Sequence, residues 1–468
     1  MTGETRVRRD SEPVVVVASN RGPVTHQRGP DGDIRPRRGG GGLVSALSPL
    51  LRRRDSLWIA SAMSEVDREM AGRTVRVDGG LQVQFVDIEA ARLRRSYDLV
   101  CNGTLWFLHH HLFDATRRPV FDRRWWEAWS DYVDMNRSFA AAIRENAPEG
   151  SVVLVQDYHL CLVAEELRLS GSGLASVHFS HTPFAAPETF RILPSRVRKE
   201  ILSGMAAFDS CGFHTARWRD CFLACCDQEG VEPPSTFVAP LGPDEQSLKD
   251  DAVDPRCVRE WERILESAEG RRLIVRVDRI EPSKNILRGL RAFDELLETH
   301  PEHRGEVVFA HFLYPSRQRL PEYTAYHKEV LSLAEHLNRK WGDAAWTPVV
   351  VDDTDDHLRS LAALGAYDVL VVNPVRDGLN LVAKEGPLVN RRDGEVILST
   401  EAGAYEELGE TAHGVEPFDV SATAEAMHAA LTSDETVRRS RAARLKELAA
   451  ARTPEDWLLD QLSAVGAL

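Results

Sequence analysis

Short apolar runs rich in valine and isoleucine recur along the chain, and stretches with helical spacing separate them. In the first half the runs cover residues 13–18, 57–60, 81–86, 152–156, 175–179 and 210–213. The longest helical pattern, residues 125–146, places Trp126, Trp129, Val133 and Phe139 on an inward face. Strands that alternate with helices predict a parallel sheet with helices on both faces.

A second alternating series follows a break in the pattern. Expected strands cover residues 273–277, 307–314, 349–351, 368–372 and 396–399, and expected helices cover residues 283–297, 322–339, 355–366 and 379–390. Between the two series, prolines thicken over residues 232–243 and an acidic stretch follows. We therefore expect a first domain of residues 1–240 and a second of residues 241–453, with a final helix in residues 454–468 packing back on the first.

Composition narrows the function classes. The 468 residues are 43% hydrophobic and 28% charged, as in ordinary globular proteins, and the net charge of −14 argues against a nucleic-acid or anionic membrane partner. No apolar run is long enough to span a bilayer, and the charged N-terminus lacks the apolar core of a signal peptide. Seven irregularly spaced cysteines fit a reducing compartment. These features predict a cytoplasmic protein.

The most informative segment is a strand, turn and helix around residues 369–385. A β-branched run ends at Val372, a turn containing Arg376, Asp377 and Gly378 follows, and the next helical stretch carries Glu385. In a parallel α/β sheet, ligands bind beyond the carboxyl ends of strands, and the first N–H groups of the following helix favour an anion such as a diphosphate. The segment is thus a candidate binding site for a phosphorylated ligand.

Polar residues follow other expected strands as well. Each alone has an ordinary interpretation, because a lone strand-end histidine is more often structural and a basic turn is often only solvated. Together they favour two anionic substrates that meet between the domains, with no metal ligand set. A flexible, basic, glycine-rich loop is expected at residues 35–42. The strand-end residues are Arg21, Asp157, His181, Arg279, Lys284 and Arg317.

Several of these segments resemble the trehalose-6-phosphate synthase family, in the family's order and over residues 14–425. The matching segments are Ser-Asn-Arg21, Gly41-Gly-Leu-Val-Ser-Ala-Leu47, Asn102-Gly-Thr-Leu-Trp106, Asp157-Tyr-His-Leu, His181-x-Pro-Phe184, Gly212-Phe-His-Thr215, Val277-Asp-Arg279, Pro315-Ser-Arg317 and Arg376-Asp-Gly-x-Asn-Leu-Val. The resemblance implies the α/β fold class GT-B, with two doubly wound, Rossmann-like domains facing across a cleft. It further implies glucose transfer from a nucleotide diphosphate glucose to glucose 6-phosphate, with retention and without metal or cofactor.

The resemblance also assigns residues to roles. It places the sugar-phosphate acceptor on Arg21, Tyr97, Trp106, Asp157 and Arg317, and the catalytic groups on His181, Arg279, Lys284 and Asp157. It places the donor on Gly41, Gly42, Arg279, Lys284, Asp377, Gly378, Leu379, Asn380, Leu381, Val382 and Glu385.

Departures from the family pattern bear on the donor. Pro282-Ser-Lys-Asn285 stands where the family commonly has Tyr-x-Lys-Gly, and Glu385-Gly-Pro-Leu-Val-Asn390 also differs. Some changes resemble the validoxylamine-phosphate synthase branch, which takes a guanosine donor but lacks the arginine matching Arg376. We expect GDP-glucose in preference to UDP-glucose. The alternatives are a transferase acting on glycerol phosphate or a cyclitol phosphate, and an inactive sugar-phosphate sensor; a homo-oligomer is possible.

Overall fold

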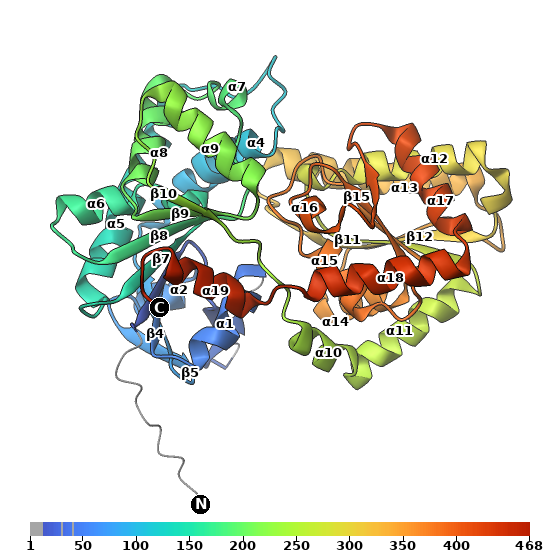
Figure 1. The fold of residues 1–468 in the computed structure, drawn as a ribbon, viewed down its shortest axis with the longest axis horizontal. Coiled ribbons are helices and arrows are strands. Elements are labelled where there is room, and N and C mark those ends of the chain that lie inside the picture. The colour runs from blue at the N-terminus through green and yellow to red at the C-terminus, as the bar shows by residue number, and fades with distance from the viewer. Residues whose placement is uncertain (1–12, 30, 40–41) are drawn as a thin grey trace, which may run out of the picture.

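The computed structural model describes residues 13–29, 31–39 and 42–468 and contains two α/β lobes side by side (Figure 1). The first lobe is built on an eight-stranded sheet, parallel except for its edge pair β5–β6. Its strands, in spatial order, are β10 (Ser235–Val238), β9 (Ser210–Phe213), β8 (Ala175–Ser180), β7 (Val152–Gln156), β1 (Val15–Ser19), β4 (Ser56–Ser61), β6 (Leu81–Val86) and β5 (Thr74–Asp78).

The second lobe is built on a six-stranded, wholly parallel sheet. In spatial order its strands are β13 (Val349–Asp352), β12 (Val307–Pro315), β11 (Arg272–Ile280), β14 (Val369–Val372), β15 (Glu395–Ser399) and β16 (His413–Val415). The central strands are buried on both faces, so they read as unbroken β-branched runs rather than as alternating patterns. The predicted fold of two doubly wound domains is confirmed.

Helices cover the sheets. Those around the first sheet are α1 (Gly42–Arg52), α2 (Glu65–Glu69), α3 (Ala90–Arg95), α4 (Trp106–His109), α5 (Arg123–Asn146), α6 (Val163–Leu169), α7 (Pro187–Phe190), α8 (Ser195–Ala206) and α9 (Ala216–Glu229). Those of the second lobe are α10 (Glu245–Ala252), α11 (Pro255–Ala268), α12 (Ile286–Thr299), α13 (Pro321–Trp341), α14 (His357–Ala366), α15 (Val382–Val389), α16 (Tyr405–Leu408), α17 (Val420–Thr432) and α18 (Glu435–Ala450).

The last helix, α19 (Pro454–Ser463), returns to the first lobe (Figure 1). Its Trp457 is fully buried and packs edge-on against Phe179 of β8, with ring centroids 5.0 Å apart. A capping box formed by Thr453 and Asp456 begins the helix. The chain therefore crosses between the lobes twice, and α19 ties its end to the first sheet.

Four short helical segments complete the fold. They are the π-helix η1 (Ser96–Leu105) and the 3₁₀ turns η2 (Tyr158–Leu160), η3 (Pro282–Lys284) and η4 (Pro301–His303). Among the described residues, no helix is long and apolar enough to cross a membrane.

The prediction of a loop over residues 35–42 is wrong in part. Ile34–Arg38 is a strand, β3, that pairs antiparallel with β2 (Val24–Arg28) in a two-stranded hairpin. Its turn is closed by the Gly29 N–H, which donates to the Asp33 carbonyl. Backbone pairing across this turn stabilises strands whose side chains are mostly polar, which is why no apolar run marked them.

Candidate active site

In each sheet there is one point from which successive strands are added in opposite directions. The candidate residues lie at these points. In the first sheet β1 and β7 are neighbours, with later strands added outward on each side, and Arg21 and Asp157 follow these two strands. In the second sheet β11 and β14 are the corresponding pair, and Lys284 and Asp377 follow them. Such topological switch points are where open α/β sheets bind ligands. The topology alone thus defines two half-sites.

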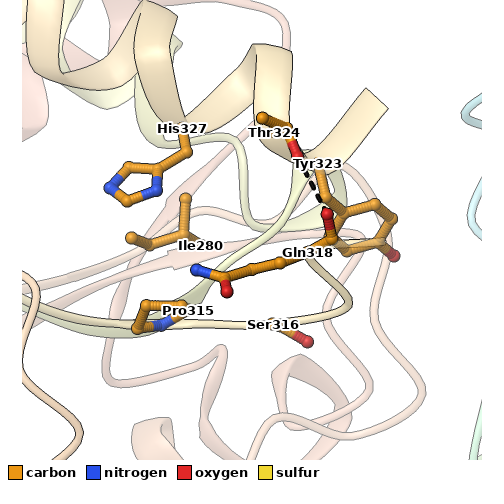
Figure 2. A pocket seen from close by; sticks show the side chains of 7 residues that line it. All are labelled: Ile280, Pro315, Ser316, Gln318, Tyr323, Thr324 and His327. Carbon is orange, nitrogen blue, oxygen red and sulfur yellow. Dashed lines mark hydrogen bonds between the residues drawn. The ribbon is translucent and has the colours of Figure 1, made fainter. Parts of the chain in front are cut away.

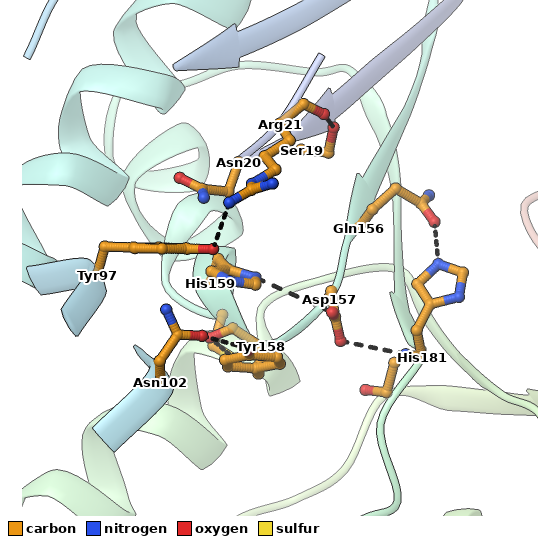
Figure 3. A network of polar contacts seen from close by, with 12 residues as sticks. Ser19, Asn20, Arg21, Tyr97, Asn102, Gln156, Asp157, Tyr158, His159 and His181 are labelled. Carbon is orange, nitrogen blue, oxygen red and sulfur yellow. Dashed lines mark hydrogen bonds and ion pairs between the residues drawn. The ribbon is translucent and has the colours of Figure 1, made fainter. Parts of the chain in front are cut away.

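Beyond β1, Arg21 extends over residues from η1 and η2 (Figure 3). Its guanidinium donates to the Tyr97 hydroxyl over 3.2 Å and lies 5.9 Å from the centre of that ring. Tyr97 in turn stacks on His159. Burial alone would raise the pKa of Tyr97, but the charges of Arg21 and Arg317 outweigh it and lower that pKa. The tyrosine therefore reports a positive field at this point.

Arg317, after β12, reaches the same place from the second lobe. Its guanidinium stacks 3.8 Å above the Trp106 ring and donates to the hydroxyls of Tyr323 (2.7 Å) and Tyr158 (3.5 Å). Glu281 lies 3.7 Å away. Trp106 and Tyr158 belong to the first lobe, so Arg317 joins the acceptor residues predicted there. An arginine held by rings and hydroxyls keeps most of its charge for a ligand.

Asp157 is held in a strained conformation at the tip of β7. Its φ of 73° and ψ of 168° fall in a region that is almost exclusive to glycine. Its carboxylate accepts from the His181 N–H over 3.3 Å and lies 3.9 Å from His159 Nδ1 (Figure 3). Burial raises the pKa of Asp157 to about 6, against the opposing influence of these hydrogen bonds and of Arg317.

The ring of His181 belongs to a hydrogen-bonded chain that ends on α19. Its Nε2 is 2.9 Å from Gln156 Oε1 (Figure 3), and its Nδ1 is 3.2 Å from His214 Nε2. Gln156 Nε2 then donates to Gln461 Oε1 over 3.2 Å. Burial lowers the pKa of His181 well below its usual value, so the ring is neutral. With both nitrogens engaged, this ring is fixed in place rather than free to carry a proton.

The second half-site is built around an ion pair. Lys284 Nζ donates to Asp377 Oδ2 over 2.6 Å and lies 3.8 Å from Asp278, while the Asn380 amide donates to the same Asp377 oxygen over 3.1 Å. Burial would raise the pKa of Asp377, but the adjacent Lys284 outweighs it, and that pKa is lowered. Arg279 pairs with Glu281 over 3.1 Å. Lys284 and Arg279 of this half-site are therefore each paired with a carboxylate.

The turn after β14 packs tightly against the first lobe. A Cβ atom on Gly378 would stand only 1.9 Å from the His181 carbonyl oxygen, and one on Gly42 only 2.6 Å from Leu381 Cδ1. The helix α15 begins at Val382, later than the predicted residue 379, because Asn380 takes a left-handed conformation (φ 78°).

The remaining donor candidates surround this turn. Leu379 is buried and its carbonyl accepts from the Ala404 N–H over 2.7 Å. Glu385 lies in the first turn of α15, where burial raises its pKa. Gly41 lies outside the described residues.

Backbone strain marks the same places. Seven described residues other than glycine have a positive φ, and four of them are Asp157, Asn285, Arg317 and Asn380. Each of these follows a strand that borders a switch point or, for Arg317, the neighbouring strand β12. Strained conformations persist where function requires them. The structure therefore concentrates strain on the half-sites that strand topology defines.

Some residues of the site were missed from the sequence. Glu281, Tyr158 and Tyr323 hold Arg317 and Arg279, and His214 holds His181. Arg376 was placed in the candidate turn from the sequence, but its contacts were not: it is buried, lies 4.6 Å from the Trp218 ring and donates to His111, so it joins the lobes.

Two signals in the chain could have found some of these residues. One is the run of three histidines, residues 109–111, just after Trp106. Its middle member, His110, stacks on the Trp106 ring with centroids 3.8 Å apart. The other is the Gly212-Phe-His-Thr215 segment, which contains His214.

A small cavity of about 280 Å³ flanks Arg317 but is separate from these half-sites (Figure 2). Its lining residues are Ile280, Pro315, Ser316, Gln318, Tyr323, Thr324 and His327. Its volume is below the range of typical ligand pockets. We therefore regard it as the space behind the Arg317 loop.

Comparison with known proteins shows the family of the chain. The model of glycosyltransferase family 20 matches residues 13–466. A trehalose-6-phosphate synthase of Mycolicibacterium smegmatis is 33% identical over 96% of this chain and 92% of its own length, and one of Mycobacterium marinum is 34% identical over 98% and 95%.

Solved structures extend the likeness to the fold. A trehalose-6-phosphate synthase structure is 26% identical, with a TM-score of 0.86 over 97% of this chain and 99% of its own. An E. coli structure bound with UDP-2-fluoro glucose is 25% identical, with a TM-score of 0.86 over 96% and 98%.

Proposed function

The chain belongs to glycosyltransferase family 20, and on that basis we propose that it is a trehalose-6-phosphate synthase. It transfers glucose from a nucleotide diphosphate glucose to glucose 6-phosphate. One observation carries the proposal. The loops beyond both switch points meet, and they bring four cations together: Arg317 and Arg279 lie over the Trp106 ring, Arg21 lies at Tyr97, and Lys284 lies at Asp377.

The acceptor phosphate fits the pair Arg21 and Arg317. Both guanidinium groups contact aromatic residues, and the hydroxyl of Tyr97 lies at Arg21 while that of Tyr158 lies at Arg317. Guanidinium forks bind phosphate oxygens in pairs, and binding this remote phosphate positions the attacking hydroxyl. Asp157, between the phosphate end and His181, accepts a hydrogen bond from an acceptor hydroxyl.

The donor diphosphate fits Lys284 and Arg279. When the bond between the anomeric carbon and the diphosphate oxygen breaks, negative charge collects on the departing diphosphate and positive character on the sugar. Lys284 and Arg279 stabilise the departing charge. We assign the glucose hydroxyls to Asp377 and the residues 378–382, and the nucleoside to Glu385, as the family resemblance implies.

The reaction proceeds on one face of the sugar, with retention. The acceptor oxygen forms its bond to the anomeric carbon on the side that the diphosphate leaves, and its proton passes to the departing phosphate oxygen. This route requires no protein base and no metal ion, in keeping with the neutral, fixed ring of His181. A contact between His181 and the donor sugar stays a prediction.

For the donor base we propose guanine, with uracil as the alternative. The proposal rests on the departures from the family pattern at residues 282–285 and 385–390. The side chains of Ser283 and Asn285 point into the protein, where Asn285 donates to the carbonyls of Asn373 (3.0 Å) and Pro417 (2.6 Å). They shape the Lys284 turn rather than touch a base. The E. coli structure holds a uridine analogue, so the comparison of donors is decisive.

The test is product formation from glucose 6-phosphate with GDP-glucose and, separately, UDP-glucose, each in EDTA. Mass and anomeric NMR identify the disaccharide phosphate. We expect an α,α-linked product, unchanged by EDTA and formed faster from GDP-glucose. A strong preference for UDP-glucose would contradict the guanine proposal alone. Transfer only to glycerol 3-phosphate or a cyclitol phosphate would identify another acceptor, and no transfer at all would favour a sensor.

A further inference from the structure

A cluster of imidazoles lies at the end of α12 that is remote from the active site. We define the histidine cluster as His300, Glu302, His303 and His428. The first three follow α12 and lie in or beside η4, and His428 is on α17, which packs along α12. The helix α12 has 14 residues, about 20 Å, and begins directly after Lys284 and Asn285. The cluster is thus separate from the half-sites.

The ligand atoms of the cluster lie close together. Those of His300, Glu302 and His428 lie within 4.8 Å of one another, and His303 Nε2 is 3.0 Å from His428 Nδ1. Glu302 Oε1 is 3.5 Å from His300 Nδ1 and 3.8 Å from His428 Nδ1. Among the residues that the structure describes, no other set of three such side chains converges in this way.

These separations match those of a tetrahedral ion. With bonds of about 2.0–2.1 Å to nitrogen and oxygen, neighbouring ligand atoms around Zn²⁺ stand about 3.3 Å apart. The separations of 3.0, 3.5 and 3.8 Å bracket this value. The rings of His300 and His428 are stacked, with centroids 3.7 Å apart, so one ring turns about its Cβ–Cγ bond for both lone pairs to meet one ion. The His428 side chain is 27% exposed and has room to turn.

A further carboxylate orients one of the imidazoles. His300 Nε2 is 3.0 Å from Glu425 Oε1 on α17, so the ring places its proton on Nε2 and leaves Nδ1 as a free lone pair towards Glu302. Metal-binding histidines are commonly held in this way by a carboxylate on the nitrogen that does not bind the ion. Glu425 therefore belongs to the cluster as an orienting residue.

The ligand types of the cluster suit an ion. Three imidazoles and one carboxylate converge, and both groups bind metal ions in their deprotonated forms. Imidazole nitrogen favours Zn²⁺ and its neighbours in the first transition row over Mg²⁺.

We propose that the histidine cluster is a surface site for a first-row transition-metal ion such as Zn²⁺, formed by His300, Glu302, His303 and His428. The bound ion links η4 to α17 and so fixes the end of the α12–α17 pair. The sequence indicated no metal site because His428 lies 125 positions after His303. This site is independent of the proposed reaction and leaves its chemistry metal-free.

The test uses the full chain after dialysis against EDTA, with ZnCl₂ or CoCl₂ as the only added metal. Calorimetry gives the affinity and stoichiometry for Zn²⁺, and the visible spectrum of Co²⁺ reports tetrahedral nitrogen and oxygen ligands. The variants are His428→Ala and His300→Ala. The matched control is His336→Ala, which removes an exposed histidine from α13. Circular dichroism without metal verifies that each variant is folded.

We expect one ion per chain, a higher melting temperature with Zn²⁺, and at least tenfold weaker binding in both cluster variants. His336→Ala should bind as the wild type does, and MgCl₂ should shift neither signal. The proposal fails if His428→Ala and His300→Ala retain wild-type affinity, or if the Co²⁺ spectrum shows thiolate ligands instead. It also fails if Zn²⁺ does not bind the wild-type chain at all.

Discussion

The two half-sites hold their cations in opposite ways. On the donor side, Lys284 pairs with Asp377 and Arg279 pairs with Glu281, so each positive charge has a carboxylate beside it. On the acceptor side, Arg317 rests on the Trp106 ring and its hydrogen bonds go to tyrosine hydroxyls, while its one carboxylate, Glu281, lies farther away at 3.7 Å and also pairs with Arg279. Within the described part of the chain, Arg21 has no carboxylate within ion-pair distance.

The two aspartates show the same contrast. Burial opposes ionisation of both Asp157 and Asp377. The pKa of Asp157 rises to about 6, whereas Lys284 brings the pKa of Asp377 below its ordinary value. A half-site whose arginines are held mainly by rings and hydroxyls suits a phosphate that must bind and leave as a whole. A half-site with paired charges suits a diphosphate whose charge grows only during the reaction.

The largest effect is expected for Lys284→Ala. Turnover should fall at least ~10²-fold, because a group that stabilises the departing charge is lost. The free energy of unfolding should fall by about 3–5 kcal/mol, because Asp377 is left buried without its cation, whereas Asp278 keeps its ion pair with Arg276. Initial rates and urea unfolding measure the two effects.

The double variant Lys284→Ala/Asp377→Asn separates these effects. It should regain part of the lost stability and none of the lost turnover. Recovery of turnover in the double variant would show that Lys284 only neutralises Asp377. The donor half-site would then not stabilise the departing diphosphate through Lys284.

On the acceptor side, Arg317→Ala should weaken substrate recognition. Loss of charge-assisted hydrogen bonds to phosphate costs about 1.5–3 kcal/mol, so the preference for glucose 6-phosphate over glucose should drop about 10–150-fold. The measurement is kcat/KM for both sugars. Arg319→Ala is the matched control, since Arg319 is exposed and pairs with Asp98 over 3.2 Å. If Arg317→Ala keeps the wild-type preference for glucose 6-phosphate, the assignment of the acceptor phosphate to this half-site is wrong.

Asp157 should make stability depend on pH in the acid range. Because its pKa is raised to about 6 in the folded protein, folding binds a proton, and this contribution to stability is full below about pH 4 and lost as the pH rises through 6. Relative to the Asp157→Asn variant, the free energy of unfolding of the wild-type chain should fall by up to about 3 kcal/mol between pH 4 and 7.

Urea unfolding of both proteins at several pH values measures this difference and cancels other titrating groups. A difference that does not vary with pH would show that Asp157 is ionised at its ordinary pKa. The acceptor phosphate itself has a second pKa near 6, so the rate profile is informative only relative to Asp157→Asn.

The smallest effect is expected for Gln461→Leu, which cuts the chain from α19 to His181. Without the Gln461 oxygen, the Gln156 amide is free to turn away from His181 Nε2. One hydrogen bond of about 0.5–1.5 kcal/mol predicts a fall in kcat of roughly 2–10-fold. Gln461→Glu keeps an acceptor and should stay near the wild-type rate. Equal losses in both variants would point to packing of α19 instead.

The strands were predictable from the sequence because of their burial. β7 and β9 match their predicted ends, since a strand covered on both faces is mostly apolar. The hairpin of β2 and β3 and the π-helix η1 were not predictable in this way. The former depends on backbone pairing across a turn, and the latter on a hydrogen-bond spacing that leaves no apolar period.

For the site, the strand-end residues were predictable and their partners were not. Lys284 and Asp377 each follow an apolar run, and a parallel sheet brings such positions to one edge. The hydroxyl of Tyr158 meets Arg317 from 159 positions away, a contact that depends on how the two lobes meet. The local sequence pattern contains no information about contacts between the two lobes.

The contact between Gly378 and the His181 carbonyl sets a mechanical limit. At this point main chain rests on main chain, so no side chain fits on Gly378 unless the two segments move apart. A methyl group added to Gly378 would clash with the His181 carbonyl and force the two half-sites apart by more than an ångström, although every charged side chain would be unchanged. The missing side chain of Gly378 thus sets the spacing of the two half-sites.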